Sequence, residues 1–235
     1  MDDKFYGDIS SDLAREAYAP ISTTNTKSKK RNLKLGINSS EIFLSDPKML
    51  GFVAAKHKFV GKMIEGFENV LEVGCMDGFG SIIVSDFVKS LTSIDFYKEH
   101  IEQAKKNVEP HKDNISFIGG DFLEYKFNKK FDSCFALDVL EHIDPKQEQI
   151  FLSKVLECLH PKGVFIVGMP SLESQAYASK ENIKTHINCQ TANQLTITLK
   201  SYFDNVFSFG MNDEVLHTGY SKMCHYIIKI CTSPK

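Results

Sequence analysis

The segment Val70-Leu71-Glu72-Val73-Gly74-Cys75-Met76-Asp77-Gly78-Phe79-Gly80-Ser81 determines the fold that we expect for this chain. Apolar and β-prone residues lead into a glycine-rich turn, and an apolar helical pattern begins at Ser81, so a buried strand, a tight loop and a helix are expected. Glycine permits positive φ and close approach of a ligand to the backbone. The first N–H groups of the helix are unpaired donors. The loop is therefore expected to bind a ligand.

Acidic residues follow the next expected strands. Residues 91–95 form a second strand that ends in Asp95, residues 115–122 a third that ends in Asp121, and residues 131–137 a fourth that leads into Asp138. In a doubly wound sheet, the carboxylate at the end of the second strand can bind a ribose diol. Nicotinamide and flavin enzymes share the glycine turn, so the pattern predicts a cofactor that contains adenosine.

Residues 70–167 resemble the class I S-adenosylmethionine-dependent methyltransferases. Four linked motifs support the resemblance: the loop from Glu72 to Gly80, Asp95, Asp121-Phe122, and Leu140-Glu141-His142-Ile143. The usual loop of that family is E/D-x-G-x-G-x-G, and Met76 stands in place of its middle glycine. The resemblance implies S-adenosylmethionine as the cofactor and S-adenosylhomocysteine as its product.

The resemblance also implies roles for individual residues in a cofactor site. Asp95 would bind the ribose, Phe96 would pack on the adenine, and Asp121 would accept a hydrogen bond from the adenine amino group. Phe122 would cover the ring, although a strand-end cap and a core aromatic are the alternatives for this pair. Lys56, preferred over Lys58, would reach the carboxylate of the methionine moiety. The expected cofactor site consists of Lys56, Glu72, Gly74, Met76, Gly78, Asp95, Phe96, Asp121, Phe122 and Asp138.

The remaining pattern completes the expected fold. We expect an α/β, Rossmann-like, seven-stranded and mostly parallel sheet with helices on both faces and an antiparallel C-terminal hairpin. Residues 46–235 would form the methyltransferase domain. Residues 1–45 are polar, with a basic run at Lys27–Arg31, and form an N-terminal extension that is either a solvated tail or a lid over the site. The further expected elements are helices at 47–65, 97–107, 145–159 and 191–200 and strands at 164–167, 204–209 and 224–230.

Histidine is the expected base if the methyl acceptor is a hydroxyl group. Methyl transfer is an in-line displacement that depends first on positioning, and a base then removes the proton. His142, His186 and His217 lie near the expected site and are the catalytic candidates. His225 is expected to pack in a strand, and the other histidines, at positions 57, 100, 111 and 160, are expected on the surface. Glu141, His142, Asp213 and His217 are an alternative metal cluster, but no ligand spacing specifies a metal, and we expect none.

The composition favours a small-molecule acceptor. A formal net charge of −2 over 235 residues gives no general basic surface for nucleic acid.

The six cysteines show no C-x-x-C spacing, no apolar run reaches the length of a membrane span, and the first residues do not resemble a signal peptide. We therefore expect a cytoplasmic protein. Its oligomeric state is not predicted.

The acceptor is inferred mainly from absent motifs. Asp138-Val139-Leu140 differs from the Asn/Asp-Pro-Pro-aromatic motif with which nucleic-acid amino methyltransferases hold a flipped base. Residues 46–51, 169–174 and 211–214 resemble methyltransferases of bacterial surface-polysaccharide assembly. An oxygen of a sugar, a nucleotide-linked sugar or a phosphate-bearing precursor is the expected acceptor. The alternatives are N- or C-methylation of a quinone or amine precursor, a noncatalytic cofactor-binding subunit, and a nicotinamide oxidoreductase.

Overall fold

The computed structural model describes residues 33–235, and their compact unit begins at Leu35. Most of the polar extension, including the basic run at Lys27–Arg31, lies outside the described residues. Within residues 33–235, none of the helices has the length and hydrophobicity that a membrane crossing requires.

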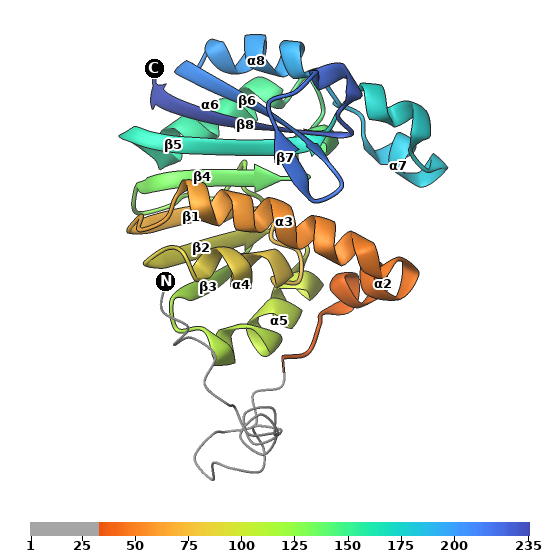
Figure 1. Cartoon of the computed structure of the whole chain (residues 1–235). Coiled ribbons are helices and arrows are strands. Elements are labelled where there is room, and N and C mark those ends of the chain that lie inside the picture. Colours follow the sequence, from red (N-terminus) through yellow and green to blue (C-terminus); the bar gives the residue numbers. More distant parts are fainter. Residues whose placement is uncertain (1–32) are drawn as a thin grey trace, which may run out of the picture. The chain divides into compact units, whose positions relative to one another are not determined.

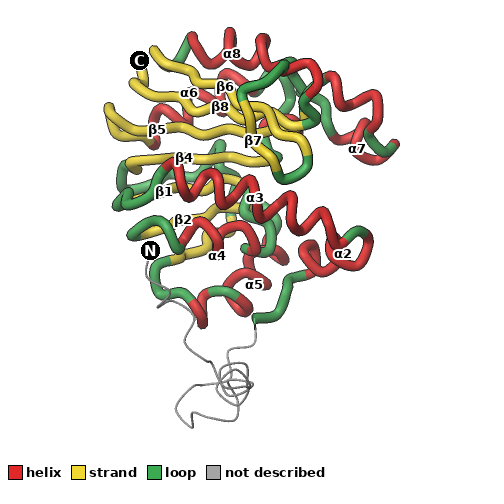
Figure 2. Tube along the Cα trace, viewed as in Figure 1, coloured by secondary structure: helices red, strands yellow, loops and turns green. Residues whose placement is uncertain are grey.

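One sheet of eight strands forms the centre of the unit, in the order β3-β2-β1-β4-β5-β8-β6-β7 (Figures 1 and 2). The first five strands in this order are parallel, whereas β8 pairs antiparallel with β5 and β6. The expected Rossmann-like sheet with an antiparallel C-terminal part is therefore confirmed. The strands are β1 Asn69–Val73, β2 Ser90–Asp95, β3 Ile115–Gly119, β4 Phe131–Leu137, β5 Leu159–Pro170, β6 Phe203–Asn212, β7 Val215–His217 and β8 Tyr226–Pro234.

Helices cover both faces of the sheet, as expected. Val60, Val84 and Ile101 pack helices α3, α4 and α5 on one face, whereas Phe151 and Leu195 pack α6 and α8 on the other (Figure 1). Burial on both faces explains why the parallel strands are almost continuously apolar. The helices are α2 Ile37–Ser45, α3 Pro47–Met63, α4 Phe79–Ser85, α5 Lys98–Asn107, α6 Glu148–Cys158, α7 Lys180–Thr185 and α8 Ala192–Lys200. Short 3₁₀ helices are η2 Glu109–His111, η3 Leu140–His142, η4 Glu173–Tyr177 and η5 Ser221–Met223.

The strand order reverses between β1 and β4. The chain runs outward through β1, β2 and β3 and then crosses back to β4 on the other side of β1. Open α/β sheets bind ligands at such a switch point, beyond the carboxyl ends of the strands. Helices α2 and α7 lie at this edge, on the right of Figure 1.

The eighth strand was not expected. Residues 211–220 were predicted to be a polar loop, but Val215–His217 pairs with Gly210–Asn212 as β7. The turn between them is possible because Asp213 adopts a φ of 48°, a left-handed conformation that Asp tolerates better than most residues. The resulting β6–β7 hairpin lies next to α3. A Cβ added at Gly51 in α3 would meet the Glu214 carboxylate of this hairpin.

Helix α2 was also not predicted, because its stability depends on a distant residue. The backbone N–H of Ser39 donates to Oδ2 of Asp77 at 2.8 Å, and the Ser39 hydroxyl donates to Oδ1 at 2.6 Å. Both residues are buried. The pair joins α2 to the glycine-rich loop across 38 residues of sequence.

Gly80 is required for helix packing. It lies in α4 beneath the His57 ring, and a Cβ at this position would overlap Nε2 of His57. The ring cannot easily move away because its Nδ1 is bonded to the carbonyl oxygen of Val53 at 2.7 Å. We expect Gly80→Ala to lower the free energy of unfolding by about 1–3 kcal/mol through overpacking.

Urea denaturation of purified variants measures this effect. Gly119→Ala is the matched control, because a Cβ there would meet its nearest neighbour, Ile101, at an ordinary 3.9 Å. A Gly80→Ala variant as stable as the Gly119→Ala variant would contradict the packing role.

Candidate functional site

The loop between β1 and α4 keeps the backbone path of a glycine-rich loop despite Met76. Gly74, Met76 and Gly78 have φ values of 80°, 48° and 83°. Met76 therefore adopts the left-handed conformation that glycine normally supplies, and its side chain is 44% exposed. The replacement of the middle glycine changes the side chain next to the loop but not the course of the loop.

Asp95 fixes this loop from the end of β2. Its Oδ2 accepts the backbone N–H of Met76 at 2.8 Å, and its Oδ1 accepts the backbone N–H of Tyr97 at 2.9 Å. Each carboxylate oxygen has two lone-pair directions. Asp95 can therefore hold the loop and still accept hydrogen bonds from a ligand.

Glu72 and His57 lie together beneath the loop. The Ser93 hydroxyl donates to Oε2 of Glu72 at 2.6 Å, and Ser81 donates to the same oxygen. Burial raises the pKa of Glu72 to about 7 and lowers that of His57 to about 4. The bond from Nδ1 of His57 to the Val53 carbonyl leaves Nε2 as an acceptor 3.9 Å from Oε1 of Glu72. Glu72 positions the loop from within, and His57 is packed rather than on the surface as expected.

The two aromatic residues predicted to contact adenine have different environments. Phe96 is 65% exposed beside the Tyr97 ring, with the ring centroids 4.3 Å apart. Phe122 is buried against Phe151, with the centroids 5.3 Å apart. Phe122 is therefore a core aromatic, the alternative left open for it, and not a free platform for a base. Asp121 is exposed, and its Oδ1 accepts the backbone N–H of Leu123 at 2.9 Å.

Lys56 and Asp138 form an ion pair at the edge of the sheet. The Lys56 side chain is only 3% exposed, and its ammonium contacts Oδ2 of Asp138. It also lies 4.8 Å from the Phe52 ring centroid and 4.7 Å from that of Tyr226. Burial alone would raise the pKa of Asp138, but the Lys56 charge outweighs it and the pKa is lowered. Lys58 is exposed, so only Lys56 points toward the site.

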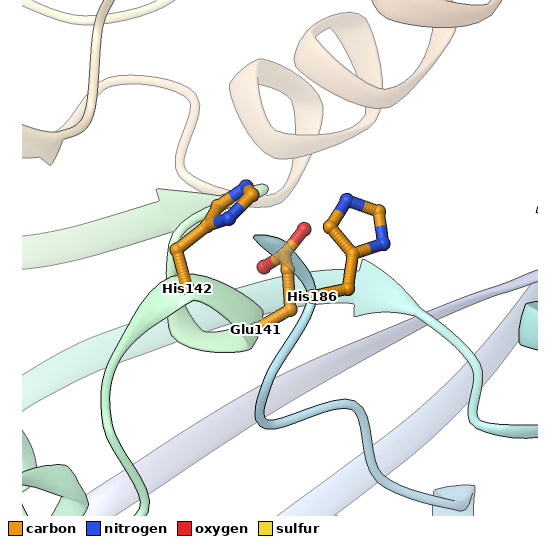
Figure 3. Close-up of side chains that lie close together, drawn as sticks. All are labelled: Glu141, His142 and His186. Atoms are coloured by element: carbon orange, nitrogen blue, oxygen red, sulfur yellow. The ribbon is translucent and has the colours of Figure 1, made fainter. Parts of the chain in front are cut away.

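Glu141, His142 and His186 gather next to this ion pair. Figure 3 shows the Glu141 carboxylate between the two imidazole rings, whose centroids are 5.1 Å apart. Nδ1 of His142 bonds the carbonyl oxygen of Thr185 at 3.0 Å, and Nδ1 of His186 bonds Oε1 of Gln175 at 3.1 Å. Because both partners are acceptors, each Nδ1 donates the proton of its bond, and Nε2 is the nitrogen left for other contacts. Burial raises the pKa of Glu141 well above its usual range.

His217 lies in the β6–β7 hairpin and not in this cluster. Its Nε2 bonds Oδ1 of Asn212 at 2.9 Å, and its Nδ1 accepts the backbone N–H of Gly219 at 3.0 Å. Both ring nitrogens are therefore engaged within the hairpin. This environment does not favour the predicted role of His217 as a base, and the hairpin that engages it was itself not predicted.

The other histidines divide between the surface and the interior. His111 and His160 are exposed, as expected. His100 was expected on the surface, but its Nε2 bonds Nδ2 of Asn38 in α2 at 2.8 Å. His225 packs against Phe52, with the ring centroids 5.3 Å apart.

Two residues of the site were not identified as site residues from the sequence. Asp77 lies within the quoted loop, but its partner Ser39 is too distant in sequence to be recognised. Tyr226 comes from the last strand and packs beside Lys56, and its buried hydroxyl faces the Asp138 carboxylate. An aromatic residue in an apolar strand gives no signal of such a position.

Comparisons with known proteins find similar chains among methyltransferases. A family model described as a methyltransferase domain matches residues 70–163. The ubiquinone biosynthesis O-methyltransferase of Rickettsia canadensis is 26% identical over 108 residues, which cover 46% of this chain and 45% of that protein. The chain thus spans about half the length of the curated relatives it matches.

Solved structures share the fold at low identity. The N-methyltransferase NodS from Bradyrhizobium japonicum, in complex with S-adenosylhomocysteine, has a TM-score of 0.58 and 16% identity, covering 77% of this chain and 87% of that one. A Haloferax volcanii putative methyltransferase, in complex with the Trm112 activator, has a TM-score of 0.65 and 13% identity, covering 84% and 94%. Residues 70–163 therefore match a methyltransferase domain, and the described residues share the Rossmann-like fold of solved methyltransferases, one of them crystallised with S-adenosylhomocysteine.

Proposed function

We propose that this protein transfers a methyl group from S-adenosylmethionine to an oxygen of a small polar acceptor. The observation that supports it most is the arrangement at the β1–β4 switch point. The loop tied to Asp95 lies on one side, and Lys56, Asp138 and the two histidines with a free Nε2 lie on the other. One edge of the sheet thus offers separate groups for a cofactor and for an acceptor.

The assignment of cofactor contacts follows the chemistry of these groups. Asp95 accepts the ribose hydroxyls, and the exposed Phe96 ring packs on the adenine. The Lys56–Asp138 pair presents one positive and one negative charge, which complement the carboxylate and the ammonium of the methionine moiety. Asp121 accepts the adenine amino group. We expect the methyl group of a cofactor held in this way to lie toward His142 and His186.

The transfer step follows from the sulfonium chemistry. An acceptor oxygen attacks the methyl carbon in line with the sulfur, the new C–O bond forms as the C–S bond breaks, and the electron pair of that bond stays on sulfur. The hydroxyl proton passes to a free Nε2 of His142 or His186. Such a base contributes roughly 10²- to 10⁴-fold to the rate.

The polar side chains near the transfer point support a polar acceptor. Glu141, His142, His186 and Gln175 offer hydrogen bonds where an apolar acceptor would need an apolar wall. A sugar, a nucleotide-linked sugar or a phosphate-bearing precursor of a bacterial surface glycan fits this chemistry. The O-methyltransferase similarity favours oxygen as the methylated atom, and the similarity to an N-methyltransferase keeps nitrogen as the second candidate.

Transfer of labelled methyl groups into a fractionated cell extract tests the proposal. We expect label in the metabolite or glycan fraction, with a loss of at least about tenfold in the His142→Ala, His186→Ala double variant. Label in protein or nucleic acid would contradict the small-molecule acceptor. NMR of the isolated product distinguishes methylated oxygen from nitrogen or carbon.

A noncatalytic cofactor-binding subunit is the competing function. The fold is similar to that of a putative methyltransferase bound to an activator protein. If the purified chain binds S-adenosylhomocysteine but transfers label only after a second protein is added, the subunit interpretation replaces the proposed one.

A further inference from the structure

Glu141, His142 and His186 direct three ligand atoms toward one point. One carboxylate oxygen and one nitrogen of each ring lie within 4.8 Å of one another. The corners of an equilateral triangle with that side are about 2.8 Å from its centre, whereas bonds from zinc to such ligands are about 2.0–2.2 Å long. Side-chain movements of less than about 1 Å would therefore bring all three atoms onto one metal ion.

The Glu141 carboxyl group is buried beside the two histidines, where it can bind a cation. Its side chain is fully buried, and neither oxygen has a hydrogen-bond partner among residues 33–235. Burial of a carboxylate without a partner is costly. The neighbouring Lys56 ammonium is paired with Asp138, so a cation bound at Glu141 would not have to displace it.

Both histidines make an outer hydrogen bond of the kind found in metal sites. Nδ1 of each ring donates to an oxygen, on Thr185 for His142 and on Gln175 for His186. In metal sites, this outer bond fixes the ring and leaves the other nitrogen to bind the metal. Figure 3 shows the two rings on either side of the carboxylate.

We propose that Glu141, His142 and His186 bind one first-row divalent metal ion, such as Mn²⁺, Co²⁺ or Zn²⁺. Two imidazoles and one carboxylate suit these ions, and three protein ligands leave positions open for other molecules. The sequence alone had led us to expect no metal, because no ligand spacing specified one, and the alternative cluster considered there included Asp213 and His217 in place of His186.

The role of this metal rests on the proposed methyl transfer. The acceptor hydroxyl binds an open coordination position, and the metal lowers its pKa. The C–O bond then forms as the C–S bond breaks, the electron pair goes to sulfur, and the hydroxyl proton goes to water. When the metal is bound, His142 and His186 are its ligands, and the base role proposed above for their Nε2 atoms applies only to the metal-free site.

Titration of the purified full chain with Mn²⁺ tests the site directly. The chain is treated with EDTA and dialysed, and free Mn²⁺ is followed by electron paramagnetic resonance without any cofactor. We expect one saturable site per chain. Glu141→Gln, His142→Gln and His186→Gln should each weaken binding by at least about tenfold. His111→Gln, at an exposed histidine outside the cluster, should leave it unchanged.

His186→Gln keeps the test decisive if Glu141→Gln does not fold, because His186 lies in a partly exposed loop. The absorption bands of bound Co²⁺ give a second readout, and they should disappear in this variant. A lack of saturable binding of Mn²⁺, Co²⁺ and Zn²⁺ to the wild type would overturn the site. Equal binding by all three variants would overturn it as well.

Methyl transfer in EDTA and after metal is restored separates this inference from the proposed function. Activity that is lost in EDTA and restored by Mn²⁺ supports the acceptor-binding role. Full activity in EDTA would overturn that role and leave methyl transfer intact. A chain that binds the metal but transfers no methyl group would refute the proposed function and keep the metal site.

Discussion

Asp95→Asn should weaken the binding of S-adenosylhomocysteine by about 100-fold. Both carboxylate oxygens accept backbone N–H groups, from Met76 and from Tyr97. Asparagine has only one acceptor oxygen, so its amide NH₂ would face one of these donors. The variant therefore weakens the bond that shapes the loop and the charge-assisted bond to the ribose, and the two losses together are worth roughly 2–3 kcal/mol. About 2.7 kcal/mol corresponds to 100-fold in Kd.

Isothermal titration calorimetry measures this change. Asp86→Asn is the matched control, because the Asp86 carboxylate is exposed and pairs with Lys112 on the surface. Its affinity should equal that of the wild type. If Asp95→Asn binds with wild-type affinity while remaining folded by circular dichroism, neither the loop bond nor a ribose contact by Asp95 matters for the cofactor.

The Glu72→Gln variant should be more stable at pH 8 than at pH 5, whereas the wild type should change little between these pH values. Burial raises the pKa of Glu72 from 4.5 to about 7, so the folded state holds a proton that the unfolded state has released. This contribution is fully present below pH 4.5 and is lost as the pH rises to about 7. A shift of this size corresponds to roughly 3 kcal/mol. Glutamine keeps the acceptor for Ser81 and Ser93 and cannot ionise.

His57 makes the comparison between wild type and variant necessary. Burial lowers its pKa from 6.5 to about 4, so its contribution to stability is present above pH 6.5 and is lost as the pH falls toward 4. The two opposite shifts offset each other in the wild type. We therefore expect wild-type stability to change little from these two groups, whereas the stability of Glu72→Gln rises with pH.

Urea denaturation at pH 5 and pH 8 gives both curves. Glu65→Gln, an exposed glutamate paired with Lys62, is the control and should follow the wild type. A stability difference between Glu72→Gln and wild type that is the same at both pH values would show that Glu72 is ionised in the folded protein throughout this range.

The loop and the strand ends were predictable because each depends on neighbouring residues. Gly74 and Gly78 follow an apolar strand, and Asp95 ends the next one, so local pattern is sufficient to predict their place. Met76 was the exception to the glycine pattern, and its φ of 48° shows that the loop retains its path. The antiparallel end of the sheet was also predictable, because two late apolar runs remained after the parallel strands.

The contacts between distant segments could not be predicted. Lys56 and Asp138 are 82 residues apart, and the sequence favoured Lys56 as a cofactor contact without revealing its partner. His142 and His186 were each predicted near the site, but their meeting around Glu141 depends on the path of the chain after β5. Phe122 was given a role at the adenine because a buried aromatic and an exposed one have the same sequence signal.

The bonds between Ser39 and Asp77 couple the folding of α2 to the ordering of the glycine-rich loop. Any free energy that α2 gains from bonding an ordered loop is gained equally by the loop from α2, because such coupling is reciprocal. A ligand that orders the loop must therefore also slow the local opening of α2. Backbone amide exchange at Ser39, whose N–H is held by Asp77 at 2.8 Å, reports the occupancy of a loop 38 residues away.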